Sequence, residues 1–176
     1  SLFSLRRFHP KDKVVVLTDH PTAERVRDRP QLTSMITDLK IIDLPDDYDG
    51  RLRSRTLKTS VRNLIDGDFL TIDTDTVICG SLDEVDNLPV KNIGMVPEMH
   101  GPFKNHITYQ LITNELKRIY DTDVSGAPYW FNSGCMFVRD NEFTHEFFRK
   151  WNEEWKVATF QKNASSDQRP LLKVDH

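Results

Sequence analysis

The chain has 176 residues, of which 38% are hydrophobic and 29% charged, and its formal net charge at pH 7 is −3. This length suits a single domain with a sizeable core, and the composition is that of an ordered globular protein rather than a disordered one. The small negative charge gives no sign of a nucleic-acid or membrane surface, and no apolar run approaches the roughly 20 residues needed to cross a bilayer.

Two cysteines, Cys79 and Cys135, lie within apolar runs. We interpret both as buried free thiols of a reducing compartment, with a disulfide between them as the alternative. Asn163 begins an Asn-x-Ser sequon, but this pattern is too common to indicate secretion without a signal peptide. We therefore predict a cytoplasmic protein.

Strand-like apolar runs alternate with helical patterns along the chain. The end of a helix is predicted at residues 2–8, so the chain is expected to begin inside a domain. Strands are predicted at residues 14–17, 41–42, 69–72, 77–79, 93–96 and 130–138, and helices at 22–29 (ended by Pro30), 54–65, 107–120 and after Asp140. This alternation predicts an α/β sandwich with a largely parallel sheet.

Two of the predicted helices have distinctive apolar stripes. The helix at 107–120 follows the four-residue series Ile107, Leu111, Glu115 and Ile119. The helix after Asp140 has aromatic residues at the same spacing, at Phe143, Phe147, Trp151 and Trp155. We interpret the aromatic stripe as core packing rather than as a cofactor-binding surface.

Four Asp-x-Asp pairs occur, at Asp47/Asp49, Asp66/Asp68, Asp73/Asp75 and Asp121/Asp123. Only Asp73-Thr74-Asp75 lies between apolar strand-like runs, whereas the other three lie in polar stretches typical of solvated turns. Residues i and i+2 of an extended segment project to the same side, so the carboxylates of Asp73 and Asp75 are expected to converge. A hard divalent ion, completed by phosphate oxygens, would relieve their repulsion. The alternative is an Asx-turn that caps the strand.

Two later segments add polar residues to an apolar context. Residues 129–138 read Tyr-Trp-Phe-Asn-Ser-Gly-Cys-Met-Phe-Val, and Asp167-Gln168 follow about thirty residues later. Together with the Asp-x-Asp strand, these segments resemble the retaining glycosyltransferases of family eight and their close relatives. Residues 4–19 and 81–85 are also similar to that family, so the resemblance covers nearly the whole chain.

The resemblance implies the GT-A fold, a Rossmann-like α/β/α sandwich with a mostly parallel sheet, in one catalytic-core domain at residues 1–176. It also implies that the chain lacks the family's first strand and its C-terminal part. That part normally supplies a third metal-ligating histidine, and His176 lies too close to Asp167 to be this ligand.

The function implied is transfer of a hexose, with retention, from a UDP-sugar to a saccharide or glycoconjugate acceptor. Mn²⁺ or Mg²⁺ would bind Asp73 and Asp75. The donor-binding residues implied are Arg55, Lys58, Asp73, Thr74, Asp75, Ser133 and Gly134. The catalytic residues implied are Asn132 and Asp167, which would bind sugar hydroxyls, and Gln168, which would lie near the anomeric carbon. Glu98 is a candidate for the acceptor side.

Each of these residues also has an interpretation without a ligand. Lys58 and Arg55 share a helix face whose charges could simply be exposed to solvent. Asn132 would suit a turn before a glycine, and Asp167 would suit a helix N-cap. Two other functions stay open. One is a non-catalytic sugar-nucleotide-binding module of the same fold. The other is a haloacid-dehalogenase-type phosphatase with Asp73 as nucleophile, although the mid-chain position of the motif and the lack of a later acidic pair disfavour it.

Overall fold

The computed structural model describes residues 1–175. His176, considered above as a metal ligand, lies outside the described residues. The chain forms two compact units. Unit 1 consists of residues 1–61 and 72–89, and unit 2 consists of residues 62–71 together with the chain from Val90 onward.

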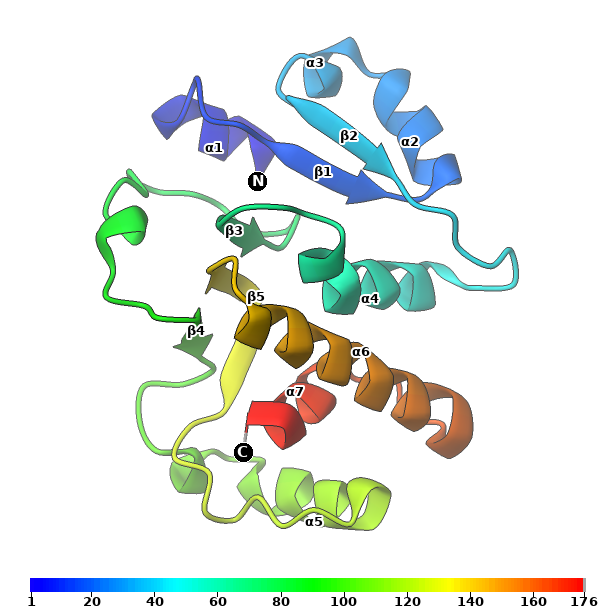
Figure 1. Cartoon of the computed structure of the whole chain (residues 1–176), viewed down its shortest axis with the longest axis vertical. Helices are drawn as coiled ribbons and strands as arrows, with labels where there is room; N and C mark the ends of the chain where they lie inside the picture. Colours follow the sequence, from blue (N-terminus) through cyan, green and yellow to red (C-terminus); the bar gives the residue numbers. More distant parts are fainter. Residues whose placement is uncertain (176) are drawn as a thin grey trace. The chain divides into compact units, whose positions relative to one another are not determined.

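Unit 1 contains a small parallel sheet with short helices. Its helices are α1 (Leu2–Phe8), α2 (His20–Arg27), α3 (Pro30–Thr33) and α4 (Gly50–Ser60), with a 3-10 turn η2 (Val85–Asn87). Strands β1 (Val15–Thr18) and β2 (Asp38–Ile41) pair in parallel, with Val15 opposite Asp38 and Thr18 opposite Ile41. Figure 1 shows these two strands side by side, with α2 and α3 next to β2.

Two prolines of this unit, Pro21 and Pro30, lie in the first turn of a helix. Asp19 caps α2 by accepting a hydrogen bond from the Thr22 backbone N–H, and Pro21 lies in the first turn. Pro30, which was predicted only to end a helix, occupies the first position of α3. A proline is tolerated there because its missing N–H has no partner within a helix in any case.

Unit 2 contains a three-stranded sheet and the longer helices. After the turn η1 (Val61–Asn63), its elements are β3 (Phe69–Ile72), β4 (Ile93–Pro97), η3 (Phe103–Asn105), α5 (Tyr109–Tyr120), β5 (Phe131–Val138), α6 (Glu142–Lys162) and α7 (Gln168–Asp175). The strand order is β3-β5-β4, and β4 runs antiparallel to β5. The α/β class is therefore confirmed. The described strands form two separate sheets, of which only the β1–β2 sheet is wholly parallel, rather than one largely parallel sheet.

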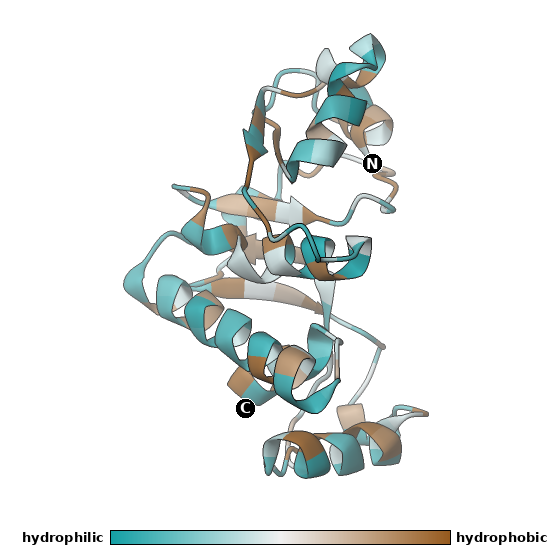
Figure 2. Cartoon of the chain, turned by 90° about the vertical axis from the view of Figure 1, so that its right-hand side faces the viewer, coloured by the Kyte–Doolittle hydropathy of each residue, from teal (hydrophilic) through white to brown (hydrophobic). Residues whose placement is uncertain are grey.

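One hydrophobic core cluster of unit 2 joins η3, α5, the segment 124–130, α6 and α7. It is formed by Phe103, Ile112, Leu116, Ile119, Tyr120, Val124, Ala127, Trp130, Ala158 and Leu172. Figure 2 shows hydrophilic and hydrophobic segments alternating along α5 and α6, as expected of amphipathic helices.

The predicted apolar stripe of α5 is correct at Ile119, which is buried, and wrong at Ile107 and Leu111. Ile107 is 97% exposed and precedes the helix, and Leu111 is 61% exposed. The buried face is instead Ile112, Leu116 and Ile119, spaced i, i+4 and i+7. That spacing brings three large apolar side chains onto one face without including Glu115, which explains why it is the face that packs.

The aromatic stripe of α6 is core packing, as predicted, for three of its four members. Phe147, Trp151 and Trp155 are buried, whereas Phe143 is 56% exposed in the first turn. The Trp151 indole also donates a hydrogen bond of 2.8 Å to the Asp167 carbonyl oxygen. This helix therefore holds a predicted site residue in addition to its role in the core.

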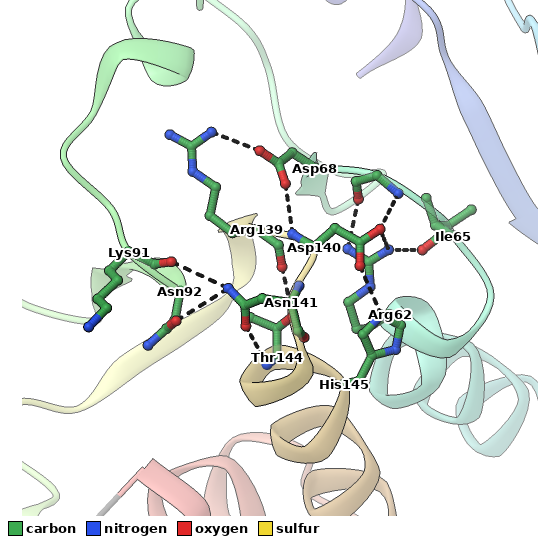
Figure 3. A network of polar contacts seen from close by, with 11 residues as sticks. Arg62, Ile65, Asp68, Lys91, Asn92, Arg139, Asp140, Asn141, Thr144 and His145 are labelled. Carbon is green, nitrogen blue, oxygen red and sulfur yellow. Dashed lines mark hydrogen bonds and ion pairs between the residues drawn. The ribbon is translucent and has the colours of Figure 1, made fainter.

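A polar network fixes the start of α6 (Figure 3). Asn141 and Thr144 form a capping box, in which each side chain bonds the other residue's backbone N–H. Asp68, before β3, accepts hydrogen bonds from the Arg139 guanidinium and the Asp140 N–H, which lower the pKa of its carboxyl. Asp68 was predicted to be a solvated turn residue, but it connects the start of β3 to the end of β5.

The second half of this network surrounds Asp140. Its carboxylate accepts hydrogen bonds from the Gly67 N–H and from His145, and it lies 3.4 Å from the buried Arg62 guanidinium. Arg62 in turn donates to the carbonyls of Gly67 and Ile65. A buried arginine is tolerated here because carbonyls and a carboxylate surround it.

Two predictions near the Asp-x-Asp segment are wrong. Residues 77–79 form no strand, and Val77 is 70% exposed. Cys79 is exposed and Cys135 half-buried, so neither is a buried thiol, although the two form no disulfide, as predicted. None of the helices within residues 1–175 combines the length and the apolar composition that a bilayer crossing requires.

Candidate functional site

The predicted site residues belong to both units. Those of unit 2 lie in mutual contact, whereas in unit 1 the contact that brings site residues together is that of Lys58 with Asp73. Unit 1 contains Arg55, Lys58, Asp73, Thr74 and Asp75. Unit 2 contains Asn132, Ser133, Gly134, Asp167 and Gln168.

In unit 1, Lys58 of α4 pairs with Asp73. The Lys58 ammonium lies 2.8 Å from the Asp73 Oδ2 atom, and the two side chains are 19% and 36% exposed. Arg55 lies one turn earlier on the same helix and is partly buried. The cationic face predicted for this helix therefore reaches the first aspartate of the motif through Lys58.

The Asp-x-Asp segment itself is a turn rather than an extended strand. The Thr76 backbone N–H donates to the Asp73 carbonyl oxygen at 3.1 Å, and Thr74 and Asp75 are exposed. The alternation of side chains along a strand therefore does not apply here. An Asx-turn needs an aspartate carboxylate that accepts from a nearby backbone N–H. Within residues 1–175 the Asp73 carboxylate accepts only from Lys58 and that of Asp75 accepts no hydrogen bond, so the Asx-turn does not form.

The ligand chemistry of this segment is compatible with a divalent metal ion. Carboxylate oxygens suit Mg²⁺ and Mn²⁺, and Asp75 offers an exposed carboxylate beside Asp73 in sequence. Within residues 1–175, no group of three or more His, Cys, Asp or Glu side chains is arranged to hold a metal ion. A metal at Asp73 and Asp75 would therefore take its other oxygens from a bound ligand or from water.

Each of the other three Asp-x-Asp pairs has a member with a local structural role. Asp49 caps α4 by accepting from the Leu52 N–H, and Asp123 accepts from the Ser125 N–H in a turn. Asp68 forms the ion pair with Arg139. These roles account for the other pairs without a ligand.

In unit 2, the Asn132-Ser133-Gly134 segment forms a bulge in β5. Asn132 is opposite Val96 and Met136 is opposite Met95, so residues 133–135 are extra on the β5 side. The Gly134 N–H donates to the Asn132 Oδ1 atom at 2.6 Å, and the Asn132 Nδ2 donates to the Glu98 Oε2 atom at 2.8 Å. Bulges often occur beside functional sites because they redirect a side chain.

The bulge brings Ser133 to the Asp167-Gln168 pair. The Ser133 hydroxyl donates to the Asp167 Oδ2 atom at 2.8 Å, and both side chains are buried. The Asp167 carbonyl accepts from Trp151 of α6 and from the Leu171 N–H of α7. Asp167 directly precedes α7, the position that an N-cap occupies, and three elements of the core hold it.

Glu98, a candidate for the acceptor side on the sequence, completes the cluster through contacts with Asn132 and Gln168 that the sequence did not predict. The Gln168 Nε2 donates to the Glu98 Oε2 atom at 3.1 Å, so Glu98 accepts from both Gln168 and Asn132. Its backbone N–H donates to the carbonyl of the buried Trp130 at 2.7 Å. The signal that pointed to Glu98 was its place at the end of a predicted strand, and it directly follows β4 as Asp73 directly follows β3.

The unit 2 cluster has the chemistry of a site for a hydroxyl-rich ligand. Two carboxylates, two amides and a hydroxyl, from Glu98, Asp167, Asn132, Gln168 and Ser133, offer both donors and acceptors. No protein-family model and no curated protein sequence matches the chain. Its assignment therefore depends on the chemistry of these residues and on the resemblance of its motifs.

Proposed function

We propose that the chain is the core of a metal-dependent glycosyltransferase with the GT-A fold. It would transfer a hexose, with retention, from a nucleotide-diphosphate sugar, in the first instance a UDP-sugar, to a saccharide or glycoconjugate. The main observation in support is the hydrogen bond between Ser133 and Asp167, 34 residues apart, which unites the Asn-Ser-Gly and Asp-Gln motifs.

The unit 2 cluster suits the sugar of the donor. The Asp167 carboxylate is buried and fixed, so it can accept hydrogen bonds from sugar hydroxyls without reorganising. The carbonyl oxygen of Gln168 can accept from a sugar hydroxyl, and the second N–H of each amide, in Asn132 and in Gln168, can donate to one. The carbonyl oxygen of Gln168, as a neutral dipole, would stabilise positive charge at the anomeric carbon as the bond to the leaving group breaks.

The unit 1 residues suit the diphosphate. The Lys58 ammonium is a point charge that favours phosphate oxygens, and its pairing with Asp73 holds it at the motif. When bound at Asp73 and Asp75, a divalent metal would neutralise the negative charge that develops on the departing diphosphate.

Calorimetry of UDP binding with and without Mn²⁺ tests this assignment. Because the metal and the diphosphate would share oxygens, each should strengthen the other's binding by the same free energy. We expect Mn²⁺ to raise the UDP affinity about tenfold, equivalent to about 1.4 kcal/mol. Asp75→Ala should remove this effect, and Asp47→Ala, at an exposed aspartate of another pair, should retain it. Equal UDP affinities with and without Mn²⁺ in the native protein would contradict the proposal.

A turnover assay separates this function from the phosphatase alternative. We expect slow, Mn²⁺-dependent hydrolysis of UDP-glucose or UDP-galactose and no turnover of p-nitrophenyl phosphate. Metal-dependent hydrolysis of p-nitrophenyl phosphate that Asp73→Asn abolishes would instead identify Asp73 as a phosphatase nucleophile.

A further inference from the structure

We propose that Glu98 is a positioning residue whose carboxylate sets the orientation of the Gln168 side-chain amide. In this arrangement the carbonyl oxygen of Gln168, and not its NH₂ group, is left for the ligand. The catalytic consequence rests on the proposed glycosyl transfer, whereas the contact between the two side chains can be tested without it.

The chemistry of the partners fixes both amide orientations. An ionised carboxylate only accepts hydrogen bonds, and only the NH₂ end of an amide donates them. Glu98 Oε2 lies 2.8 Å from the Asn132 Nδ2 and 3.1 Å from the Gln168 Nε2. Rotating either amide by half a turn would bring a carbonyl oxygen against the carboxylate, which is repulsive.

Asn132 and Gln168 differ in whether the amide carbonyl oxygen already has a hydrogen-bond partner within the protein. The Asn132 Oδ1 already accepts from the Gly134 N–H, so that amide is held at both ends. Within residues 1–175, the Gln168 side chain is held only through its Nε2, and its Oε1 has no hydrogen-bond partner. Gln168 is therefore the amide of the cluster whose carbonyl oxygen remains to be used.

The main chain of Glu98 is anchored although its side chain is exposed. Its N–H bonds the carbonyl of Trp130, which is 6% exposed and belongs to the hydrophobic core of unit 2. The carboxylate thus projects from a fixed point at the end of β4. The carboxylate itself is held by the Asn132 Nδ2, and the Asn132 amide is fixed at both ends. An acceptor held in this way can orient an amide at little entropic cost, which is what a positioning residue requires.

Orientation matters because glycosyl transfer passes through an electron-poor anomeric carbon. A carbonyl oxygen near that carbon stabilises the positive charge, whereas an NH₂ group at the same point destabilises it. Loss of Glu98 would leave Gln168 free to rotate, and the reactive orientation would then be only partly populated. The effect should appear in kcat rather than in donor KM.

Two variants of similar size separate positioning from a role of the negative charge. Glu98→Gln keeps a carbonyl oxygen that accepts from both amides, while Glu98→Leu removes every acceptor. In hydrolysis of UDP-glucose or UDP-galactose by the Mn²⁺-loaded protein, we expect Glu98→Gln to retain kcat within about threefold. We expect Glu98→Leu to lower kcat by roughly 30-fold with donor KM within about twofold. Equal losses in the two variants would overturn the proposal, because they would indicate a charge or a general base.

A second measurement tests the contact between Glu98 and Gln168 and does not require any catalytic activity. The side-chain NH₂ resonances of Gln168, assigned through Gln168→Leu, should shift in ¹⁵N-labelled Glu98→Leu protein and stay near their native positions in Glu98→Gln. The resonances of exposed Gln161 serve as the control for folding. Unchanged Gln168 resonances in Glu98→Leu would overturn the contact itself. If the Gln168 resonances shift in Glu98→Leu but the native protein neither binds nor hydrolyses a UDP-sugar, the contact is confirmed. The proposed function and the catalytic role of Glu98 are then both wrong.

Discussion

Asp19 in unit 1 serves two structural roles with one carboxylate. Its Oδ1 atom accepts from the Thr22 N–H at 3.0 Å, and its Oδ2 atom accepts from the Arg53 guanidinium at 2.9 Å. Burial by itself raises the pKa of this carboxyl, but the hydrogen bonds from Thr22 and Arg53 outweigh burial and lower the pKa to about 2. The ionised form is thus the one that stabilises the fold.

We predict that this stabilisation disappears in acid. The folded pKa lies below the ordinary value of 3.8, so the contribution is present above that value and is lost as the pH falls toward about 2. Asp19→Asn keeps the helix cap but does not titrate. The difference in unfolding free energy between native protein and Asp19→Asn should therefore shrink by about 1–2 kcal/mol between pH 5 and pH 2.5. Urea unfolding measures it, and a constant difference over this range would contradict the assignment.

At the scale of elements, α5 shows which face of a helix contributes to the stability of the fold. Leu116 is fully buried and Leu111 is 61% exposed on the same helix. We predict that Leu116→Ala lowers the unfolding free energy by about 2–4 kcal/mol, because it removes packed methyl groups and leaves a cavity. Leu111→Ala should change it by less than about 0.5 kcal/mol. Urea unfolding followed by tryptophan fluorescence compares the two, and similar losses would mean that the face is wrongly assigned.

The first turn of α6 gives a second test at this scale. The Asn141 Oδ1 atom accepts from the Thr144 N–H at 3.0 Å, one of the donors that a helix start otherwise leaves unpaired. Asn141→Ala should therefore cost about 1 kcal/mol, while Asn141→Asp, which keeps the cap, should stay within about 0.5 kcal/mol of the native protein. Asn114→Ala, at an exposed site within α5, is the control and should not destabilise. A loss in the control as large as in Asn141→Ala would show that capping is not the cause.

Local sequence patterns predicted where helices and strands form better than they predicted which side chains are buried. The apolar runs at 69–72 and 93–96 are strands to within one residue, since strand formation there follows from composition. The face of α5 was mispredicted at Ile107 and Leu111 because a four-residue series and an i, i+4, i+7 series both fit the sequence, and only packing decides between them. Residues 77–79 are apolar but form no strand, because strand formation also requires a partner.

In the candidate site, too, some residues were predictable from local motifs and others were not. The motifs pointed to Asn132, Asp167 and Gln168, and the structure brings these three within one cluster of hydrogen bonds. Glu98 belongs to no motif, because its position depends on the register of β4 against β5 and on the bulge at residues 133–135. Such long-range pairing is not encoded in any short stretch of sequence.

At the scale of the whole molecule, the two units contain different chemistry. Unit 1 has an ammonium–carboxylate pair, Lys58 with Asp73, followed by the exposed Asp75. Unit 2 has amides and carboxylates around Asp167 and Glu98. The first group suits phosphate and a divalent ion, and the second suits sugar hydroxyls. If the proposed function is right, variants in the two units should affect different steps.

We predict that Asp75→Ala and Gln168→Leu separate binding from reaction. Asp75→Ala should weaken Mn²⁺-dependent UDP binding about tenfold, because it removes a metal ligand. Gln168→Leu should leave UDP affinity within about twofold, since UDP lacks the sugar, but should lower kcat for UDP-sugar hydrolysis roughly 100-fold by removing a dipole that acts in the transition state. Gln161→Leu, at an exposed glutamine of α6, should change neither quantity. Calorimetry with UDP and kinetics with UDP-glucose or UDP-galactose give the two readouts. If Gln168→Leu weakened UDP binding as strongly as Asp75→Ala does, Gln168 would contact the nucleotide, and its role at the anomeric carbon would be wrong.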